Sequence, residues 1–278
     1  MGGAGLAIVG GRGLLPRLLA EDCQRRGRPY RVVVFAGTGL DWTTGHPVIP
    51  AEFERPGRLF AALREAGCGE VVFAGGMARP RLNPLRFDGK MLVLAPRILA
   101  GLRSGDDATL SLIARIFEAE GLRVCAAHDI LGGLLMPEGI LTRAQPSDAD
   151  RADAARAAEI VAALGQVDVG QGAVVAQGLC LGLESIQGTD ALLDFVARTG
   201  AGMRPDPRGA RGVLLKAAKP GQDRRMDLPA VGPGTMAAAA AAGLAGVVVQ
   251  AGSALLLDRA ATVAAADAAG LFLWGRAA

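Results

Sequence analysis

The chain has 278 residues, which is long enough for two domains of ordinary size, and its net charge of +3 is too small to indicate a nucleic-acid-binding protein. Hydrophobic residues make up 51% of it and aromatic residues only 4%, so the sequence predicts a core of Ala, Leu, Val and Ile. Four scattered cysteines and two histidines argue against a zinc site and fit a reducing compartment. The sequence predicts neither a signal peptide nor a transmembrane helix.

Strands and helices alternate in the first half of the chain. The apolar pattern predicts strands at residues 6–9, 31–35, 71–74 and 123–126, and helices at 16–26, 58–66 and 107–120. Apolar strands separated by helices are typical of a parallel sheet covered on both faces. We therefore expect an α/β protein whose N-terminal domain, residues 1–132, is Rossmann-like.

Glycine and proline concentrate at residues 130–148, which predicts a linker that acts as a hinge. Beyond it, the sequence predicts a charged helix at 148–164, an alanine-rich helix from Thr235, and strands at 173–177, 179–183, 213–215, 246–250 and 254–257. We expect these elements to form a mixed α/β catalytic domain over residues 133–278.

A glycine-rich loop from Gly10 to Pro16 joins the first strand to the first helix. Such a loop offers backbone N–H groups to a phosphate, so the candidate substrate-binding residues here are Gly10, Gly11, Gly13, Leu14 and Pro16. Pro16 occupies the third glycine position of the dinucleotide-binding G-x-G-x-x-G pattern, and no acidic residue ends the second strand. These departures weigh against a nicotinamide-dependent oxidoreductase, and a tight turn without a ligand remains the other interpretation.

Carboxylates stand at the beginnings of two predicted helices. Asp106 and Asp107 either cap the helix that follows them or contact substrate. Glu184 follows the strand at 179–183, and Asp190 lies at the start of the next helix. Those two carboxylates could converge on a cation, although a capped helix explains them equally well.

The densest group of charged residues spans 216–227 and holds two Lys, two Arg and two Asp around Pro and Gly. This composition fits a site for an anionic substrate and a metal ion, and it also fits a solvated loop. The motifs G-x-S-x-G, H-E-x-x-H and the P-loop pattern are absent, which removes the common serine hydrolase, zincin and NTPase mechanisms.

Together these motifs resemble the UDP-2,3-diacylglucosamine pyrophosphatases of the LpxI type, from lipid A biosynthesis, over nearly the whole chain. The resemblance rests on residues 10–16, 73–80, 105–107, 168–172, 188–190 and, most specifically, 219–229. It implies a cytoplasmic hydrolase that uses Mg²⁺, or Mn²⁺, to cleave UDP-2,3-diacylglucosamine into UMP and 2,3-diacylglucosamine 1-phosphate (lipid X). It further implies a homodimer, an active site between two domains, and transient contact with the inner membrane surface.

The resemblance also assigns roles to residues. Asp227 matches the aspartate of the family's R-x-D-L-P string and is expected to be essential. The predicted catalytic residues are Asp227, Asp223, Lys219 and Arg225, and the predicted metal ligands are Asp227 and Asp190. Besides the glycine-rich loop, the predicted substrate contacts are Asp106, Asp107, Thr189, Lys216 and Gln222. Gln187 stands where many relatives are expected to have Glu, and it is given no role.

The chemistry of the residues is compatible with these roles. A metal ion together with Lys and Arg would neutralise the oxygens of a diphosphate and orient a water molecule. Two alternatives stay open: a nicotinamide-dependent oxidoreductase, and a non-enzymatic nucleotide-binding regulatory protein. Release of UMP from the lipid-linked nucleotide would separate the hydrolase from both.

Overall fold

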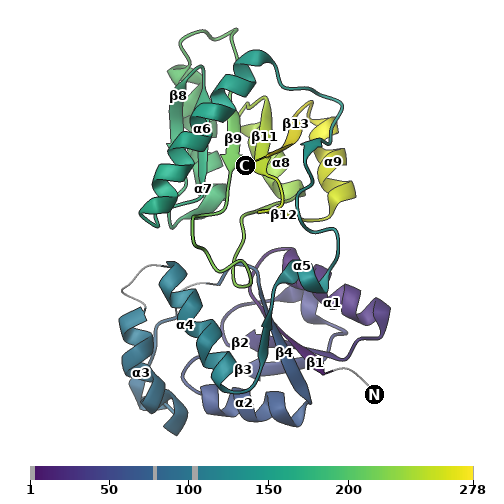
Figure 1. The fold of residues 1–278 in the computed structure, drawn as a ribbon, viewed down its shortest axis with the longest axis vertical. Helices are drawn as coiled ribbons and strands as arrows, with labels where there is room; N and C mark the ends of the chain where they lie inside the picture. Colours follow the sequence, from purple (N-terminus) through teal and green to yellow (C-terminus); the bar gives the residue numbers. More distant parts are fainter. Residues whose placement is uncertain (1–3, 78–79, 102–105, 278) are drawn as a thin grey trace. The chain divides into compact units, whose positions relative to one another are not determined.

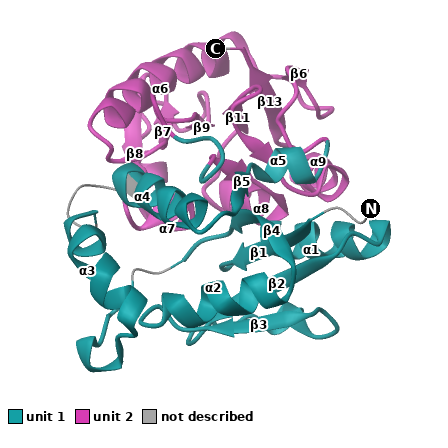
Figure 2. Ribbon diagram, turned by 60° about the horizontal axis from the view of Figure 1, so that its bottom comes forward, with its two compact units in different colours: residues 1–132, 223–227 teal, residues 133–222, 228–278 magenta. Residues whose placement is uncertain are grey.

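The computed structural model describes residues 4–77, 80–101 and 106–277, and it divides into two compact units. Unit 1 comprises residues 1–132 and 223–227, and unit 2 comprises residues 133–222 and 228–278 (Figure 2). Three residues of the family-like motifs, Ala78, Arg79 and Gly105, lie outside the described part, as does the side chain of Asp106. Within that part, no helix combines the length and the apolar character needed to span a membrane.

Unit 1 (Figure 1) is built on a five-stranded sheet with the order β3-β2-β1-β4-β5, which can be followed in Figure 2, and every neighbouring pair is parallel. Its elements are β1 (Gly5–Gly10), α1 (Leu15–Arg26), β2 (Tyr30–Phe35), the 3-10 helix Asp41–Thr43, β3 (Val48–Ala51), α2 (Pro56–Glu65), β4 (Cys68–Ala74), the 3-10 helix Pro84–Arg86, α3 (Gly89–Gly101), α4 (Asp106–Ala119), β5 (Arg123–Cys125) and α5 (Ala127–Ile130). The predicted Rossmann-like parallel sheet is confirmed.

Helices cover both faces of this sheet, and successive residues of each strand point to opposite faces. All six residues of β1 are buried. Ala7 and Val9 belong to the core that α2, α3 and α4 complete, while α1 packs against β1, β2 and β4. Aromatic residues contribute more to this core than the composition predicted. Phe117 makes T-shaped contacts with Phe60 and Phe73, with ring centroids 5.0 Å apart in each pair.

Strand β3 and helix α3 of unit 1 were not predicted from the sequence, and neither were the short helix α5 and both 3-10 helices. Strand β3 is short, lies at the edge of the sheet and contains Pro50, which an edge strand tolerates because its outer N–H positions need no partner. Helix α3 buries Met91 and Leu94 but leaves Leu92 and Val93 exposed. Apolar side chains on both faces of the helix hide the periodicity that would have identified it.

Unit 2 contains a six-stranded mixed sheet with the order β6-β13-β11-β9-β7-β8 and a separate pair, β10-β12. Its elements are β6 (Gly139–Ile140), α6 (Asp148–Gln166), β7 (Gly172–Ala176), β8 (Leu179–Leu183), α7 (Gly188–Thr199), the 3-10 helix Gly200–Met203, β9 (Val213–Lys216), β10 (Ala230–Val231), α8 (Pro233–Ala241), β11 (Gly246–Gln250), β12 (Leu255–Leu256), α9 (Arg259–Ala268) and β13 (Phe272–Arg276). The predicted mixed α/β domain is confirmed. Helix α6 packs on one face of the sheet, and α7, α8 and α9 contribute to the core on the other.

The strand directions bring several chain segments of unit 2 to one edge of its sheet. Strands β8 and β9 run the same way because each is antiparallel to β7, and β11 is parallel to β9. The C-terminal ends of β8, β9 and β11 therefore share an edge with the beginning of β7. Glu184, Lys216 and Gln250 all lie at this edge, and the segment 168–172 leads into it.

Residues 223–227 depart from the predicted domain ranges, which placed them in the C-terminal domain. Their contacts assign them to unit 1, where Met226 is 7% exposed and belongs to the same core as Phe60 and Phe117. The chain passes between the units after Gly132, inside the predicted hinge segment, and again on either side of this short insertion. Hinge motion at 130–148 remains a prediction.

Two glycine-rich loops of unit 1 pack backbone against backbone. Arg12 and Gly76 form an antiparallel bridge in which each N–H donates to the other's carbonyl, at 2.8 and 2.9 Å, and the N–H of Gly11 donates to the Ala74 carbonyl at 2.8 Å. A Cβ atom at Gly11 would lie 2.4 Å from the Gly76 carbonyl oxygen, and one at Gly75 would lie 2.4 Å from that of Arg12. Glycine at these positions is therefore a requirement of loop packing.

We expect Gly11→Ala to lower the free energy of unfolding of unit 1 by about 1–3 kcal/mol, because backbone must move to admit the methyl group. The chain has two tryptophans, Trp42 in unit 1 and Trp274 in unit 2. Urea denaturation followed by Trp42 fluorescence, in a Trp274→Phe background, therefore reports on unit 1 alone.

The matched control is Gly76→Ala in the same loop contact. A Cβ atom at Gly76 meets nothing within 4 Å, so this variant should unfold at nearly the same urea concentration as the parent. Equal stability of the two alanine variants would contradict the packing argument.

Candidate active site

A buried lysine lies at the centre of the polar cluster in unit 2. Lys216, at the end of β9, is 4% exposed, and its Nζ donates to Thr189 Oγ1 at 2.6 Å and to the Ala230 carbonyl at 3.4 Å. Glu184, 6% exposed, forms an ion pair with Lys216 at 3.6 Å and accepts a hydrogen bond from Thr189 Oγ1 at 2.8 Å. Such a buried charge persists only with a partner, and Glu184 supplies it.

The motif at residues 168–172 makes room for this carboxylate. A Cβ atom at Gly170 would lie 2.0 Å from the Glu184 carbonyl oxygen, and one at Gly172 would lie 2.6 Å from Glu184 Oε2. The Glu184 N–H donates to the Gly172 carbonyl at 2.8 Å, which continues the pairing between β7 and β8. Close packing against Glu184 is therefore sufficient to explain why the motif has glycine at these two positions.

Glu184 pairs with the ammonium group of Lys216, and convergence of Glu184 and Asp190 on a shared cation stays a prediction. Asp190 lies in the first turn of α7 and is exposed. Helix α7 has no side-chain cap, so the capping interpretation of these residues is wrong. Gln187, which received no role, occupies the N-cap position with its side chain against Ser185.

A second lysine of the charged segment is also paired. Lys219 Nζ contacts Asp168 Oδ1 at 2.6 Å, and its side chain is 9% exposed. The neighbouring turn is closed by Gln222, whose side-chain oxygen accepts from the Lys219 N–H at 3.2 Å. Three predicted residues of unit 2, Lys216, Lys219 and Thr189, therefore have buried or half-buried polar partners, and Gln222 shapes the backbone beside Lys219.

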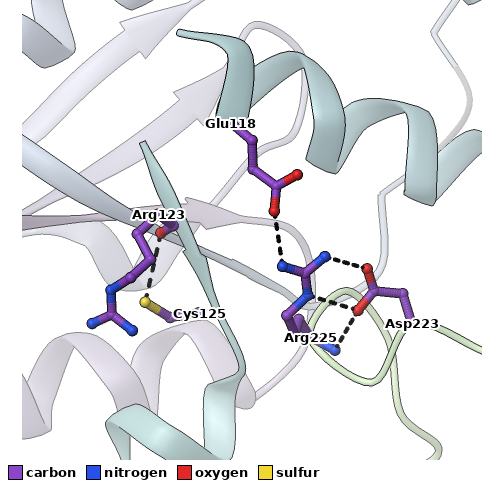
Figure 3. Close-up of polar contacts among 5 residues, drawn as sticks. All are labelled: Glu118, Arg123, Cys125, Asp223 and Arg225. Carbon is purple, nitrogen blue, oxygen red and sulfur yellow. Dashed lines mark hydrogen bonds and ion pairs between the residues drawn. The ribbon is translucent and has the colours of Figure 1, made fainter. Parts of the chain in front are cut away.

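Arg225 is held by two carboxylates within unit 1 (Figure 3). Its Nη1 lies 2.8 Å from Glu118 Oε1 on α4, and its Nε and Nη2 lie 3.0 and 2.8 Å from the two oxygens of Asp223. The hydrogen bonds from Arg225 hold the pKa of Asp223 below its usual value, and those with Asp223 and Glu118 raise the pKa of Arg225. This geometry anchors the segment 223–227 to α4.

Asp227 closes the same turn. Its N–H and that of Met226 donate to the Asp223 carbonyl, at 3.3 and 2.9 Å, and its side chain is partly buried. The neighbouring Met226 lies in the core, so the position of Asp227 is determined by packing on one side and by the turn on the other.

The carboxylates offer a limited set of metal ligands. Asp168, Asp223 and Glu184 each pair with a lysine or arginine. Over residues 4–77, 80–101 and 106–277 there is no group of three or more His, Cys, Asp or Glu side chains arranged to hold a metal ion. Asp190 and Asp227 belong to different units. A carboxylate such as Asp227 fits Mg²⁺, which keeps several waters and often takes only one or two protein ligands.

A cavity of about 370 Å³ opens among the loops that follow β1, β2, β3 and β4 of unit 1. Its charged and aromatic lining consists of Arg12, Glu52, Phe53, Glu54, Arg81 and Arg86. The strand order reverses direction between β1 and β4, and the C-terminal edge of a parallel sheet at such a point is a common place for a ligand.

The glycine-rich loop contributes the side chain of Arg12 to the lining of this cavity. The N–H groups of Gly11 and Arg12 are used in loop packing, so Gly11, one of the residues predicted to receive phosphate, does not offer its N–H to a ligand. Gly10 is the last residue of β1, Gly13 has a φ of +103°, and Leu14 and Pro16 lie at the start of α1, which has no side-chain cap. Asp107 lies in the first turn of α4.

Sequence reasoning missed four groups: Glu118, the partner role of Asp168, the ion pair of Glu184, and the arginines of the cavity. Arg12 lies inside the glycine-rich loop from Gly10 to Pro16, so its place in that loop could have identified it as a candidate. Glu118 and Arg225 are 107 residues apart, and Asp168 and Lys219 are 51 apart, so no local pattern could connect them.

Comparisons with known proteins agree over both units. The LpxI N-terminal domain matches residues 5–134, and the LpxI C-terminal domain matches residues 137–274. A relative from Caulobacter vibrioides, named UDP-2,3-diacylglucosamine pyrophosphatase LpxI, is 41% identical over 273 residues, or 97% of this chain and 96% of the relative.

Two solved structures show weak similarity. The crystal structure of gox2253 has a TM-score of 0.34 and 11% identity, covering 97% of this chain and 76% of that chain. UDP-glucose 4-epimerase from Thermus thermophilus, in complex with NAD, has a TM-score of 0.32 and 17% identity, covering 98% of this chain and 86% of that one.

We expect Glu184→Gln to destabilise unit 2 by about 3 kcal/mol or more, because it leaves the Lys216 ammonium buried without its carboxylate. The double variant Glu184→Gln/Lys216→Met should recover much of that loss, since the charge is then absent. Urea denaturation followed by Trp274 fluorescence, in a Trp42→Phe background, measures both. A double variant no more stable than Glu184→Gln would contradict the pairing.

We expect Asp223→Asn to lower stability at pH 7 by up to about 1 kcal/mol, because the ion pair is partly exposed. The folded-state pKa of Asp223 lies below the unfolded value of 3.8, so its stabilisation is present above that pH and is lost as the pH falls through the lowered pKa. Thermal unfolding midpoints of both proteins from pH 7 to pH 3 should therefore converge. A gap that stays constant across this range would refute the assignment.

Proposed function

The chain belongs to the LpxI family, and from this premise we propose that it is a UDP-2,3-diacylglucosamine pyrophosphatase of lipid A biosynthesis. The reaction adds water across the diphosphate and yields UMP and lipid X. The observation that carries the proposal is the 41% identity to the Caulobacter vibrioides enzyme over 97% of this chain. Both family domains also match in the expected order.

The residues of the candidate site suit a diphosphate substrate. Negative charge on the phosphate oxygens resists attack by water, and fixed cations reduce this resistance. We assign that role to Lys216 and Lys219, whose carboxylate partners keep the two ammonium groups in defined positions. Thr189 hydrogen-bonds to Lys216 and would orient it toward substrate.

Asp227 is our candidate for the group that orients the attacking water or binds the metal ion. Its place beside the anchored Asp223–Arg225 pair supports this role, because the ion pair with Glu118 holds the turn that carries it. We assign Asp223 and Arg225 to positioning that turn. Mg²⁺, or Mn²⁺ in its place, would polarise the diphosphate oxygens when bound, with Asp227 and Asp190 as its candidate ligands.

The remaining parts of the proposal concern location and assembly. We place the enzyme in the cytoplasm, at the inner membrane surface where its lipid-linked substrate resides, and we propose that it is a homodimer. Helix α3 supports the surface contact, because Leu92 and Val93 are 62% and 73% exposed and the charged side chains of the helix, Lys90 and Arg97, are basic.

The proposal is tested by incubating the purified full chain with UDP-2,3-diacylglucosamine and Mg²⁺. We expect UMP and lipid X to appear in equal amounts, EDTA to stop the reaction, and Mg²⁺ or Mn²⁺ to restore it. Unchanged activity in EDTA would overturn the metal requirement. Absence of UMP together with oxidation of NADH or NADPH would favour the oxidoreductase alternative.

We expect Asp227→Ala to fold normally and to lose turnover by about 100-fold or more, roughly 2.7 kcal/mol of transition-state stabilisation. Substrate binding should survive, because the lysines that contact the diphosphate are unchanged. The measurements are kcat and KM for UMP release, with thermal unfolding to verify the fold.

The comparison variant is Asp223→Ala in the same turn. Its loss should be smaller, because Asp223 acts on the substrate only through the position of Asp227. A well-folded Asp227→Ala protein with near-normal kcat would remove Asp227 from the mechanism.

A further inference from the structure

Helix α3 presents an apolar face to solvent. It lies at the margin of unit 1, where it packs against α2 and α4 (Figure 2), and its inner face buries Met91, Leu94 and Ala95. The exposed residues of its outer face are apolar: Leu92, Val93, Pro96, Leu99 and Ala100. With 3.6 residues per turn, these five positions span about 120° of the helix surface. A helix normally buries an apolar stripe of this width.

Another exposed leucine stands in the turn before the helix. Leu85 is 95% exposed, although its backbone is anchored. Its N–H donates to Asn83 Oδ1 at 3.1 Å, and the Asn83 N–H donates to Glu54 Oε1 at 3.2 Å. Arg86, the next residue, pairs with Glu52. The fold therefore holds Leu85 in solvent on a built turn.

Basic residues accompany these apolar side chains. Residues 80–101 contain one acidic residue, Asp88, and four basic ones: Arg81, Arg86, Lys90 and Arg97. The carboxylate of Asp88 is used within unit 1, where it accepts from the N–H groups of Gly57 and Met91 at 2.7 Å each. Arg97 is exposed and borders the apolar face of α3. The surface thus combines apolar side chains with an excess of positive charge.

This combination fits an anionic lipid bilayer. Apolar side chains enter the boundary between headgroups and acyl chains, while Lys and Arg beside them attract anionic headgroups. A second copy of the chain fits less well, because contact through the same face of both copies would bring like charges together.

We propose that the outer face of α3 and the turn before it dock unit 1 on an anionic bilayer, with Leu85, Leu92 and Val93 entering the interface and Arg97 meeting lipid phosphates. The identity of the membrane rests on the proposed function, whereas the docking surface rests on these exposed residues. Docking would keep the enzyme at the surface that holds its lipid-linked substrate.

The test is flotation of the full chain, without substrate, with vesicles of phosphatidylethanolamine and phosphatidylglycerol. We expect binding at least tenfold stronger than to vesicles of phosphatidylcholine, which carry no net charge. Leu92→Ser/Val93→Ser should weaken binding at least tenfold, because two apolar side chains no longer enter the bilayer. Arg97→Gln should weaken it about fivefold, the factor that corresponds to about 1 kcal/mol per basic residue. Thermal unfolding verifies the fold of each variant.

Matched controls come from exposed residues elsewhere. Met203, 63% exposed in unit 2, is the control for the apolar side chains, and Arg17, exposed on α1, is the control for Arg97. Met203→Ser and Arg17→Gln should bind vesicles like the parent. No vesicle binding by the parent, or equal binding by all variants, would overturn the proposal. Self-association that Leu92→Ser/Val93→Ser abolishes, in a parent that binds no vesicles, would assign the face to a second copy and overturn it as well.

Hydrolysis of two forms of the substrate separates the docking surface from the proposed function. Leu92→Ser/Val93→Ser should release UMP at the parental rate from UDP-2,3-diacylglucosamine dispersed in detergent, and at least tenfold more slowly from the same substrate in vesicles. A loss in detergent would assign the face to substrate binding, and parental rates in both forms would contradict docking. A protein that binds vesicles through α3 but releases no UMP from either form contradicts the enzymatic function and keeps the docking surface.

Discussion

The ion pair of Arg225 with Glu118 fixes a short segment of the C-terminal half of the chain, residues 223–227, to unit 1, and the ion pair of Arg225 with Asp223 holds the turn inside that segment. The buried side chain of Met226 reinforces the attachment, because its burial adds apolar contact to the polar anchor. The position of Asp227, on which the proposed chemistry depends, follows from these two contacts.

This arrangement divides a single sequence motif between two compact units. Lys219 and Gln222 stay in unit 2, where Lys219 pairs with Asp168, and Asp223 begins the segment that belongs to unit 1. The motif is continuous along the chain, and its division between the two units explains its composition. Its Pro and Gly residues turn the chain, and its charges secure the segment on either side of the turn.

The glycines of the other motifs have a similarly concrete use. Gly11 and Gly75 allow two loops of unit 1 to pair backbone to backbone, and Gly170 and Gly172 allow Glu184 to approach the start of β7. These packing requirements determine where two charged side chains lie. The pairing of the two loops puts Arg12 on the wall of the unit 1 cavity, and the close approach at Gly170 and Gly172 puts Glu184 beside Lys216.

Local patterns predicted most of the strands and helices because each buried strand, such as 246–250, is a continuous apolar run. They failed at β3, where Pro50 interrupts a short edge strand, and at α3, where both faces are apolar. At the site, Lys216 and Thr189 were predicted and are in contact. Arg225 was predicted to be catalytic, and the structure adds that its three nitrogens contact carboxylates, one of them 107 residues away. Tertiary pairing over such a distance leaves no mark on local composition.

The central claim is that residues 223–227 belong to the core of unit 1, and NMR of methionine methyl groups tests it most directly. The chain has seven methionines, and Met226→Leu identifies the resonance of interest. The account predicts nuclear Overhauser contacts from the Met226 methyl group to aromatic side chains of the unit 1 core, among them Phe117. A Met226 methyl group with no such contacts, and with the narrow line of a solvent-exposed side chain, would contradict it.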